Sequence, residues 1–76
     1  MKEQILAILE EIAPSVDFTA SRTLADDGVI DSFTVVNIIA ELSIAFGITV
    51  PFEEITNENF NSVDAMAALV QRLQNR

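Results

Sequence analysis

The feature that most constrains the fold of this chain is an apolar segment, residues 32–46, that has a start signal and a stop signal for a helix. Asp31 or Ser32 can cap the beginning of a helix, and Gly47 supplies the left-handed conformation that commonly ends one. Between them, one stripe of apolar residues has the spacing of a helix face turned toward a core. Its members are Val35, Ile38, Ile39, Leu42 and Phe46. The sequence therefore predicts a helix over residues 32–46.

The same segment carries a second apolar stripe on another side of the predicted helix. Its members are Phe33, Val36, Ala40 and Ile44. A helix that is apolar on two sides is either buried on both or presents one of them to a partner. Because 76 residues build only one small core, we expect this second stripe to face a partner. The alternative is that its residues cover the core.

Two further amphipathic segments predict an all-α fold. Residues 3–13 have apolar side chains at helical spacing, and Pro14 ends the pattern. The last helix is expected from about residue 62 to 74, with Asn61 and Asp64 spaced like a capping box at its start. The expected buried positions are Ile5, Ile8, Leu9 and Ile12 in the first segment, and Val63, Met66, Ala67, Val70 and Leu73 in the last.

The connections between these helices are expected to be ordered. Residues 15–30 lack a regular apolar pattern and predict a long loop. The side chains expected to hold that loop on the core are Phe18, Leu24, Val29 and Ile30. Pro51 is expected to open a short helical turn through about Asn57. The expected architecture is one domain over residues 1–76, a small four-helix bundle with three main helices, one short helix and a long loop between helices 1 and 2.

Missing residue types exclude much chemistry. The chain has no His and no Cys, which excludes a Ser/His or Cys/His nucleophile pair, a thiolate or imidazole metal site and a disulfide. Its net charge of −8 repels nucleic acid and anionic membranes. The first residues lack the apolar stretch of a signal peptide or membrane span. We expect a cytoplasmic monomer that binds no nucleic acid, inserts into no membrane and holds no metal.

The candidate functional site is the stretch from Gly28 to Phe33, where an acidic loop meets the start of the apolar helix. An Asp-Ser pair before a helix is often only a cap, and Ser32 has no base that would activate it as a nucleophile. If Ser32 is modified, another enzyme must modify it. A phosphate ester on Ser32 would lie beside the N–H groups of the first helical turn, which stabilise negative charge. The position therefore suits a phosphodiester.

Over essentially its whole length, the chain resembles the phosphopantetheinyl carrier proteins, that is, acyl, peptidyl and D-alanyl carriers. The matching positions are Asp31-Ser32-Phe33 at their Asp-Ser-(Leu, Met or Phe) motif, Leu42 and Phe46-Gly47-Ile48 at the end of the second helix, and Val50-Pro51 at the start of the third. The resemblance implies a bundle of the acyl carrier protein type and a non-catalytic protein. It also implies that Ser32 bears 4′-phosphopantetheine, whose thiol carries an acyl or aminoacyl group as a thioester.

The resemblance further implies partners and roles for individual residues. The partners would be a phosphopantetheinyl transferase, an acyl- or aminoacyl-loading ligase, and a downstream acyltransferase or synthase. Asp31 would cap the helix and help to place Mg²⁺ during the modification. We expect partners to dock on the second stripe by apolar contact. Together with Asp31, the acidic residues Asp26 and Asp27 would steer their basic surfaces toward the site.

The branch of the family stays open at this point. Gly28-Val29-Ile30-Asp31-Ser32 has two residues between the Gly and the Asp-Ser, similar to the Gly-Leu-Leu-Asp-Ser of D-alanyl carriers, whereas typical fatty-acid carriers have one. The spacing favours a stand-alone or D-alanyl type, while a carrier for fatty acid or polyketide assembly and a D-alanyl carrier for cell-wall polymers both stay open as functions. The alternative of another class is an acidic helical interaction module without a cofactor, in which Asp31-Ser32 is only a cap.

Overall fold

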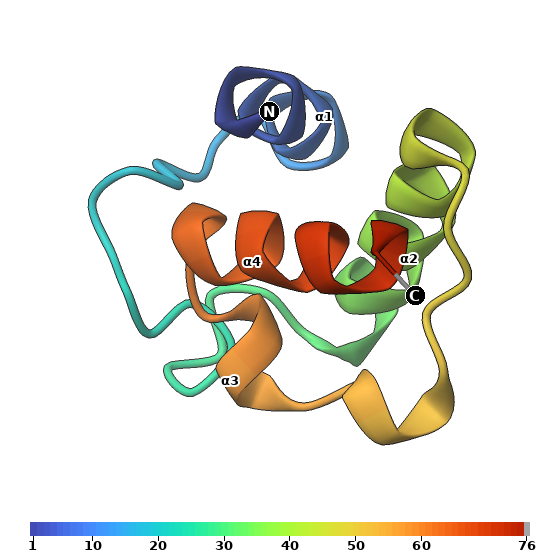
Figure 1. The fold of residues 1–76 in the computed structure, drawn as a ribbon. Helices are drawn as coiled ribbons and strands as arrows, with labels where there is room; N and C mark the ends of the chain where they lie inside the picture. The colour runs from blue at the N-terminus through green and yellow to red at the C-terminus, as the bar shows by residue number, and fades with distance from the viewer. Residues whose placement is uncertain (76) are drawn as a thin grey trace.

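The computed structural model describes residues 1–75, and within that range it consists of helices joined by loops (Figure 1). The helices are α1 (Lys2–Ile12), α2 (Ser32–Phe46), α3 (Asn57–Phe60) and α4 (Val63–Gln74), with a 3₁₀ turn, η1, over Phe52–Glu54. The all-α prediction is confirmed, and the predicted helix over residues 32–46 agrees with α2 at both ends. None of the helices in this part of the chain is both long enough and apolar enough to cross a membrane.

One apolar core lies between α1, α2 and α4, which all pack against one another. Figure 1 shows α4 crossing the middle of the molecule, with α1 and α3 on opposite sides of it. The buried residues of α4 include Leu69, which the predicted face of this helix omits. Leu69 is fully buried because α4 is covered by three other helices rather than by one. The helices thus form the bundle that the sequence predicts, with α4 at its centre.

The long loop between α1 and α2 is held on the core by three of the four expected side chains. Phe18, Leu24 and Ile30 are buried. The expectation for Val29 is wrong, since 46% of this residue is exposed. The Ile30 N–H donates to the Leu24 carbonyl at 3.2 Å, which fixes Ile30 on the core side of the loop. Its neighbour Val29 then faces solvent.

The short helical turn predicted from Pro51 to about Asn57 is wrong in its extent. Pro51 does precede a turn, but η1 ends at Glu54 and α3 is a separate helix. Thr56 interrupts the helical path with an extended conformation (φ −127°, ψ 156°), and its hydroxyl accepts a hydrogen bond from the Asn59 N–H at 3.4 Å. A threonine that caps a new helix in this way competes with continuation of the preceding turn.

The predicted capping box of Asn61 and Asp64 is also wrong. The cap of α4 is Ser62, whose hydroxyl accepts a hydrogen bond from the Ala65 N–H at 3.0 Å. The helix begins one residue later than the box requires, so Asn61 lies outside it. Sequence spacing at this junction fits either residue, and tertiary contacts of Asn61 decide the outcome.

Asn61 instead holds the long loop against the junction of α3 and α4. Its Oδ1 accepts hydrogen bonds from the backbone N–H groups of Ala25 at 3.0 Å and Asp26 at 2.9 Å. Its Nδ2 donates to the Asp26 carboxylate at 3.0 Å, and its backbone carbonyl accepts from the Leu24 N–H at 2.9 Å. These four bonds fix residues 24–26, and with them the path of the chain toward the start of α2.

We predict that Asn61→Ala lowers the free energy of unfolding by about 1–3 kcal/mol, because two backbone N–H groups and a carboxylate lose their partner. Urea unfolding measures this loss. Asn37→Ala, at an exposed position of α2, is the matched control and should change the free energy by less than about 0.5 kcal/mol. Equal effects of the two substitutions would contradict the role given to Asn61.

Candidate functional site

The cap of α2 is Asp31, which settles the choice that the sequence leaves open between Asp31 and Ser32. Asp31 has an extended backbone (φ −93°, ψ 179°), and its Oδ1 accepts a hydrogen bond from the Thr34 N–H at 2.8 Å. Ser32 is therefore the first residue inside the helix. Among residues 1–75, no hydrogen-bond partner of the Ser32 hydroxyl is found, and the residue is exposed.

The capping bonds keep the Asp31 carboxyl in its charged form. The hydrogen bond from the Thr34 backbone N–H is the main cause that lowers the pKa of Asp31 below its ordinary value, with further hydrogen bonding at Thr34 acting in the same direction. A carboxylate is also favoured at this position because the N-terminal end of a helix carries partial positive charge. The hydroxyl of Ser32 thus stands beside a carboxylate that is ionised at neutral pH.

Two other serines differ from Ser32 because their hydroxyls accept hydrogen bonds from backbone N–H groups. The chain has five serines, and Ser62 is the second one placed at the start of a long helix. Its hydroxyl is occupied as the cap of α4, and the residue is half-buried. The Ser21 hydroxyl likewise accepts a hydrogen bond from the Thr23 N–H, at 3.0 Å. Ser32 combines a position at a helix start with an exposed hydroxyl that is not used for capping.

A hollow of about 410 Å³ lies next to Ser32. One side is formed by α2 and the loop before it, with Ile30 and Val35 among the lining residues. The other side is the segment that joins η1 to α3 and enters it, including Ile55, Thr56 and Asn57. The sequence does not predict a role for this second side, because a short segment without an apolar period does not indicate where it packs. The hollow offers a mainly apolar surface beside the candidate hydroxyl.

The second apolar stripe of α2 lies on the surface, as expected. Phe33 is 76% exposed, Val36 is 62% exposed and Ile44 is 79% exposed, and Ala40 is exposed as well. The opposite side of the helix buries Ile38 and Leu42, among others. The alternative in which the stripe covers the core is therefore excluded. Val36 also lines the hollow, so the stripe and the candidate site share an edge.

Acidic residues of the loop flank the site. Asp26 and Asp27 are exposed, and the loop that contains them borders the hollow through Ala25 and Gly28. The Asp27 carboxylate accepts a hydrogen bond from the Thr23 hydroxyl at 2.6 Å. Within residues 1–75, no group of three or more carboxylate, imidazole or thiolate side chains comes together as a metal site.

Basic side chains of the described residues pair with carboxylates away from Ser32. Lys2 and Arg22 both contact Asp64, at 2.8 and 3.4 Å. Arg72 contacts Glu54 at 3.3 Å. Arg76, the remaining basic residue of the sequence, lies outside the described residues. The surface around Ser32 is consequently left anionic, with apolar side chains of α2 beside it.

Comparison with known proteins agrees with this geometry. A family described as "Phosphopantetheine attachment site" matches residues 3–70. The D-alanyl carrier protein of Lactococcus lactis subsp. cremoris (strain MG1363) is 37% identical over 73 residues, which cover 93% of this chain and 92% of that protein. The D-alanyl carrier protein of Streptococcus suis (strain 05ZYH33) is 38% identical over 74 residues, covering 96% of this chain and 94% of that protein.

A third relative, aminoacyl carrier protein 1 of Bradyrhizobium diazoefficiens, is 36% identical over 66 residues, which cover 87% of this chain and 72% of that protein. No solved structure gives a significant match. The relatives therefore include carriers named for an amino acid as well as for aminoacyl groups in general.

The lowered pKa of Asp31 predicts how its cap depends on pH. A carboxyl whose pKa falls on folding stabilises the folded state above its ordinary pKa, and this contribution is lost as the pH falls through the lower, folded-state pKa. Asp31→Ala should therefore lower the Tm at pH 7, and the difference from the wild type should shrink below the ordinary pKa of 3.8. Thermal melts followed by circular dichroism at a series of pH values measure this difference.

Asp31→Asn serves as the control for the charge, since its amide oxygen can still accept from the Thr34 N–H. The Tm of Asp31→Asn should therefore exceed that of Asp31→Ala by about the same amount at every pH of the acidic range. A difference between wild type and Asp31→Ala that stays constant across that range would show that the charge of the Asp31 carboxylate does not contribute to the cap of α2.

Proposed function

Since this chain belongs to the phosphopantetheine-attachment family, we propose that it carries an aminoacyl group as a thioester on 4′-phosphopantetheine attached to Ser32. The family itself gives a carrier function and 4′-phosphopantetheine as the prosthetic group. Two relatives named as D-alanyl carriers favour D-alanine as the cargo, and the relative named as an aminoacyl carrier supports the broader class. The family match disfavours the interaction module without a cofactor.

The observation that carries the assignment to Ser32 is its exposed hydroxyl at the start of α2, left unused because Asp31 makes the cap. In the modification, the Ser32 Oγ forms a bond to the phosphorus next to the pantetheine of coenzyme A. The bond from that phosphorus to the 3′,5′-ADP portion breaks, and the hydroxyl proton passes to a base of the transferase. The new phosphodiester is anionic and lies at the positive end of α2, which stabilises it.

In this proposal the chain supplies the attachment point for the prosthetic group and not the group that reacts with the cargo. It has no Cys and no His, so the thiol that forms the thioester comes with the prosthetic group, and activation of the cargo requires a separate loading ligase. A flexible arm fixed at one point raises the effective concentration of the bound group at each partner. We assign no enzymatic activity to the chain itself. We place it in the cytoplasm as a monomer, with one carrier domain over residues 1–76.

The exposed stripe of α2 is the surface proposed for partner docking. Phe33 directly follows the attachment site, and Val36, Ala40 and Ile44 continue the stripe along the helix. A contiguous apolar strip on a small domain is the kind of surface that other proteins cover. The acidic residues Asp26, Asp27 and Asp31 surround its start and favour partners with basic surfaces. The transferase, the loading ligase and a downstream acyltransferase are the partners that this proposal requires.

Incubation with coenzyme A, Mg²⁺ and a phosphopantetheinyl transferase of broad specificity tests the attachment site. The intact mass of the wild type should rise by one phosphopantetheine unit. Ser32→Ala should abolish the rise, because the acceptor hydroxyl is gone. Ser62→Ala and Ser43→Ala are controls that should leave it intact. Modification that persists in Ser32→Ala, or a wild type that gains no mass, would overturn the proposal.

Substitution of the stripe tests docking separately. Val36→Glu and Ile44→Glu should raise the KM of the transferase for this protein by about fivefold or more, since truncation or charging of a buried contact in an interface costs more than about 1 kcal/mol. The Tm should change by only about 2 °C, because both side chains are exposed in the free protein. Ala7→Glu, an exposed position of α1, makes the same change in charge and should leave the KM as in wild type. An unchanged KM in both stripe variants would exclude this surface.

A further inference from the structure

The hollow beside Ser32 has one wall that is weakly supported by apolar packing. We call residues 55–57 the opposite wall, since they face α2 across the hollow. In the segment from η1 to α3, Phe60 is buried, whereas Phe52 is 87% exposed and Ile55 is 42% exposed. Apolar contact therefore anchors this segment at its end, at Phe60, and not at the opposite wall itself.

Helical hydrogen bonds do not hold the segment either. η1 has three residues and α3 has four, and helices this short do not persist without tertiary contacts. Thr56 adds only a local cap to α3. Packing of α3 on α4 at Phe60 holds one end of the segment, and the remaining support of the opposite wall comes from polar contacts with the rest of the molecule.

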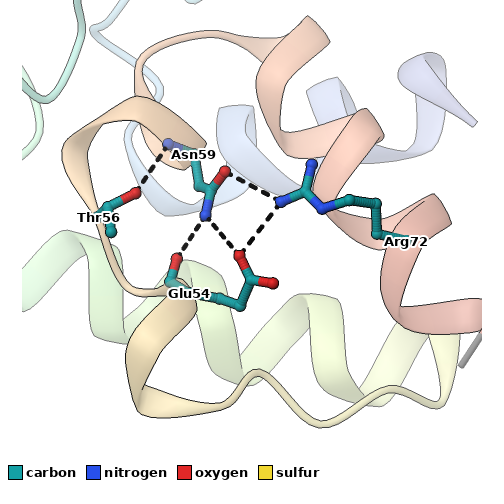
Figure 2. Close-up of polar contacts among 4 residues, drawn as sticks. All are labelled: Glu54, Thr56, Asn59 and Arg72. Carbon is teal, nitrogen blue, oxygen red and sulfur yellow. Dashed lines mark hydrogen bonds and ion pairs between the residues drawn. The ribbon is translucent and has the colours of Figure 1, made fainter.

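A network of three side chains supplies those contacts (Figure 2). The Asn59 Nδ2 donates to the Glu54 backbone carbonyl at 2.7 Å and to the Glu54 Oε1 at 3.1 Å. From α4, the Arg72 Nη2 donates to the Asn59 Oδ1 at 3.2 Å and to the Glu54 Oε1 at 3.3 Å. Figure 2 shows the Arg72 side chain extending from α4 toward the side chains of Glu54 and Asn59. The three side chains thus form a closed ring of hydrogen bonds next to the opposite wall.

Arg72 connects this network of hydrogen bonds to α4, which is packed in the core. Its neighbours on α4, Val70 and Leu73, are buried in the core, so the backbone of Arg72 is fixed. Glu54 and Asn59 flank the opposite wall on either side in the sequence. Without Arg72, these two residues still bond to each other, but none of the bonds between their side chains and a core helix remains. Arg72 thus sets where the wall stands relative to the core.

We propose that Arg72 is a positioning residue, which holds the opposite wall at the distance from α2 that an enzyme acting on Ser32 requires. This inference rests on the proposed function, because it concerns access to Ser32. Ser32, Val36 and Ile55 line the same hollow, so an enzyme that reaches the Ser32 hydroxyl also covers the opposite wall. A wall released from α4 occupies several positions, and only the fraction in the required position binds productively.

The contacts of Arg72 affect the position of the opposite wall more than the stability of the whole domain. Half of the Arg72 side chain is exposed to solvent, and ion pairs at this exposure contribute little to the stability of a whole domain. Their loss increases local opening of the elements that they hold. Arg72 substitutions should therefore change the motion of the opposite wall and the use of Ser32 much more than they change the Tm.

Arg72→Glu tests the proposal, because it places a carboxylate next to Glu54 and drives the wall away from α4. Amide hydrogen exchange at Ile55 and Asn59 should become roughly two- to fivefold faster in the unmodified protein. The KM of the transferase should rise by roughly threefold, with kcat unchanged. Arg72→Lys keeps a positive charge with three donors beside Glu54 and Asn59, so it should lie closer to the wild type than Arg72→Glu in both measurements.

Arg22→Glu is the matched control. It makes the same change in charge, but Arg22 pairs with Asp64 outside this hollow, so exchange at the opposite wall and the KM should stay as in wild type. Faster exchange with an unchanged KM would make Arg72 merely structural and overturn its positioning role. Unchanged exchange in Arg72→Glu would overturn the inference while modification of the wild type upholds the proposed function. A wild type that the transferase does not modify would overturn both.

Discussion

The hydrogen bond from the Thr34 N–H to the Asp31 carboxylate decides which group this protein presents at the start of α2. Every helix leaves free N–H groups at its beginning, and a nearby side chain usually satisfies one of them. At α4 a serine does so, and its hydroxyl is used in the bond. At α2 the aspartate does so, and the serine that follows keeps its hydroxyl for other chemistry. The difference between a serine used for capping and the serine proposed as the attachment site is thus one position relative to the cap.

The rest of the molecule keeps that hydroxyl in place and leaves its surroundings anionic. Asn61, at the junction of α3 and α4, fixes the loop that leads into α2. Arg72 of α4 supports the opposite wall of the hollow. The basic residues Lys2, Arg22 and Arg72 are paired with carboxylates elsewhere. Carboxylates therefore dominate the surface near Ser32, next to an exposed apolar stripe. Both features suit a carrier domain that other enzymes recognise and that has no His or Cys of its own.

Local signals in the sequence predict the ends of α2 to the residue, because a cap and a left-handed glycine act through bonds within a few positions. Gly47 indeed has φ 62°. Features that depend on distant residues are not predictable in this way. Asn61 resembles a helix cap in the sequence, but its partners lie in a loop 35 and 36 positions away. Similarly, the burial of Leu69 follows from helices packing on two sides of α4, which helical spacing alone does not indicate.

The same distinction between local signals and contacts with distant residues applies to the candidate site. Asp31, Ser32 and the exposed stripe are properties of a single helix, and the sequence predicts them. The wall of the hollow formed by residues 55–57 depends on an interrupted short helix and on Arg72, so it becomes visible only in the structure.

Phosphorus-to-proton correlation NMR of the protein after treatment with coenzyme A and a transferase tests the central claim most directly, because it identifies through bonds the residue that bears the phosphorus. The account predicts one phosphodiester resonance coupled to the β protons of Ser32. Coupling to the β protons of any other serine, or the absence of a phosphorus signal, would contradict it.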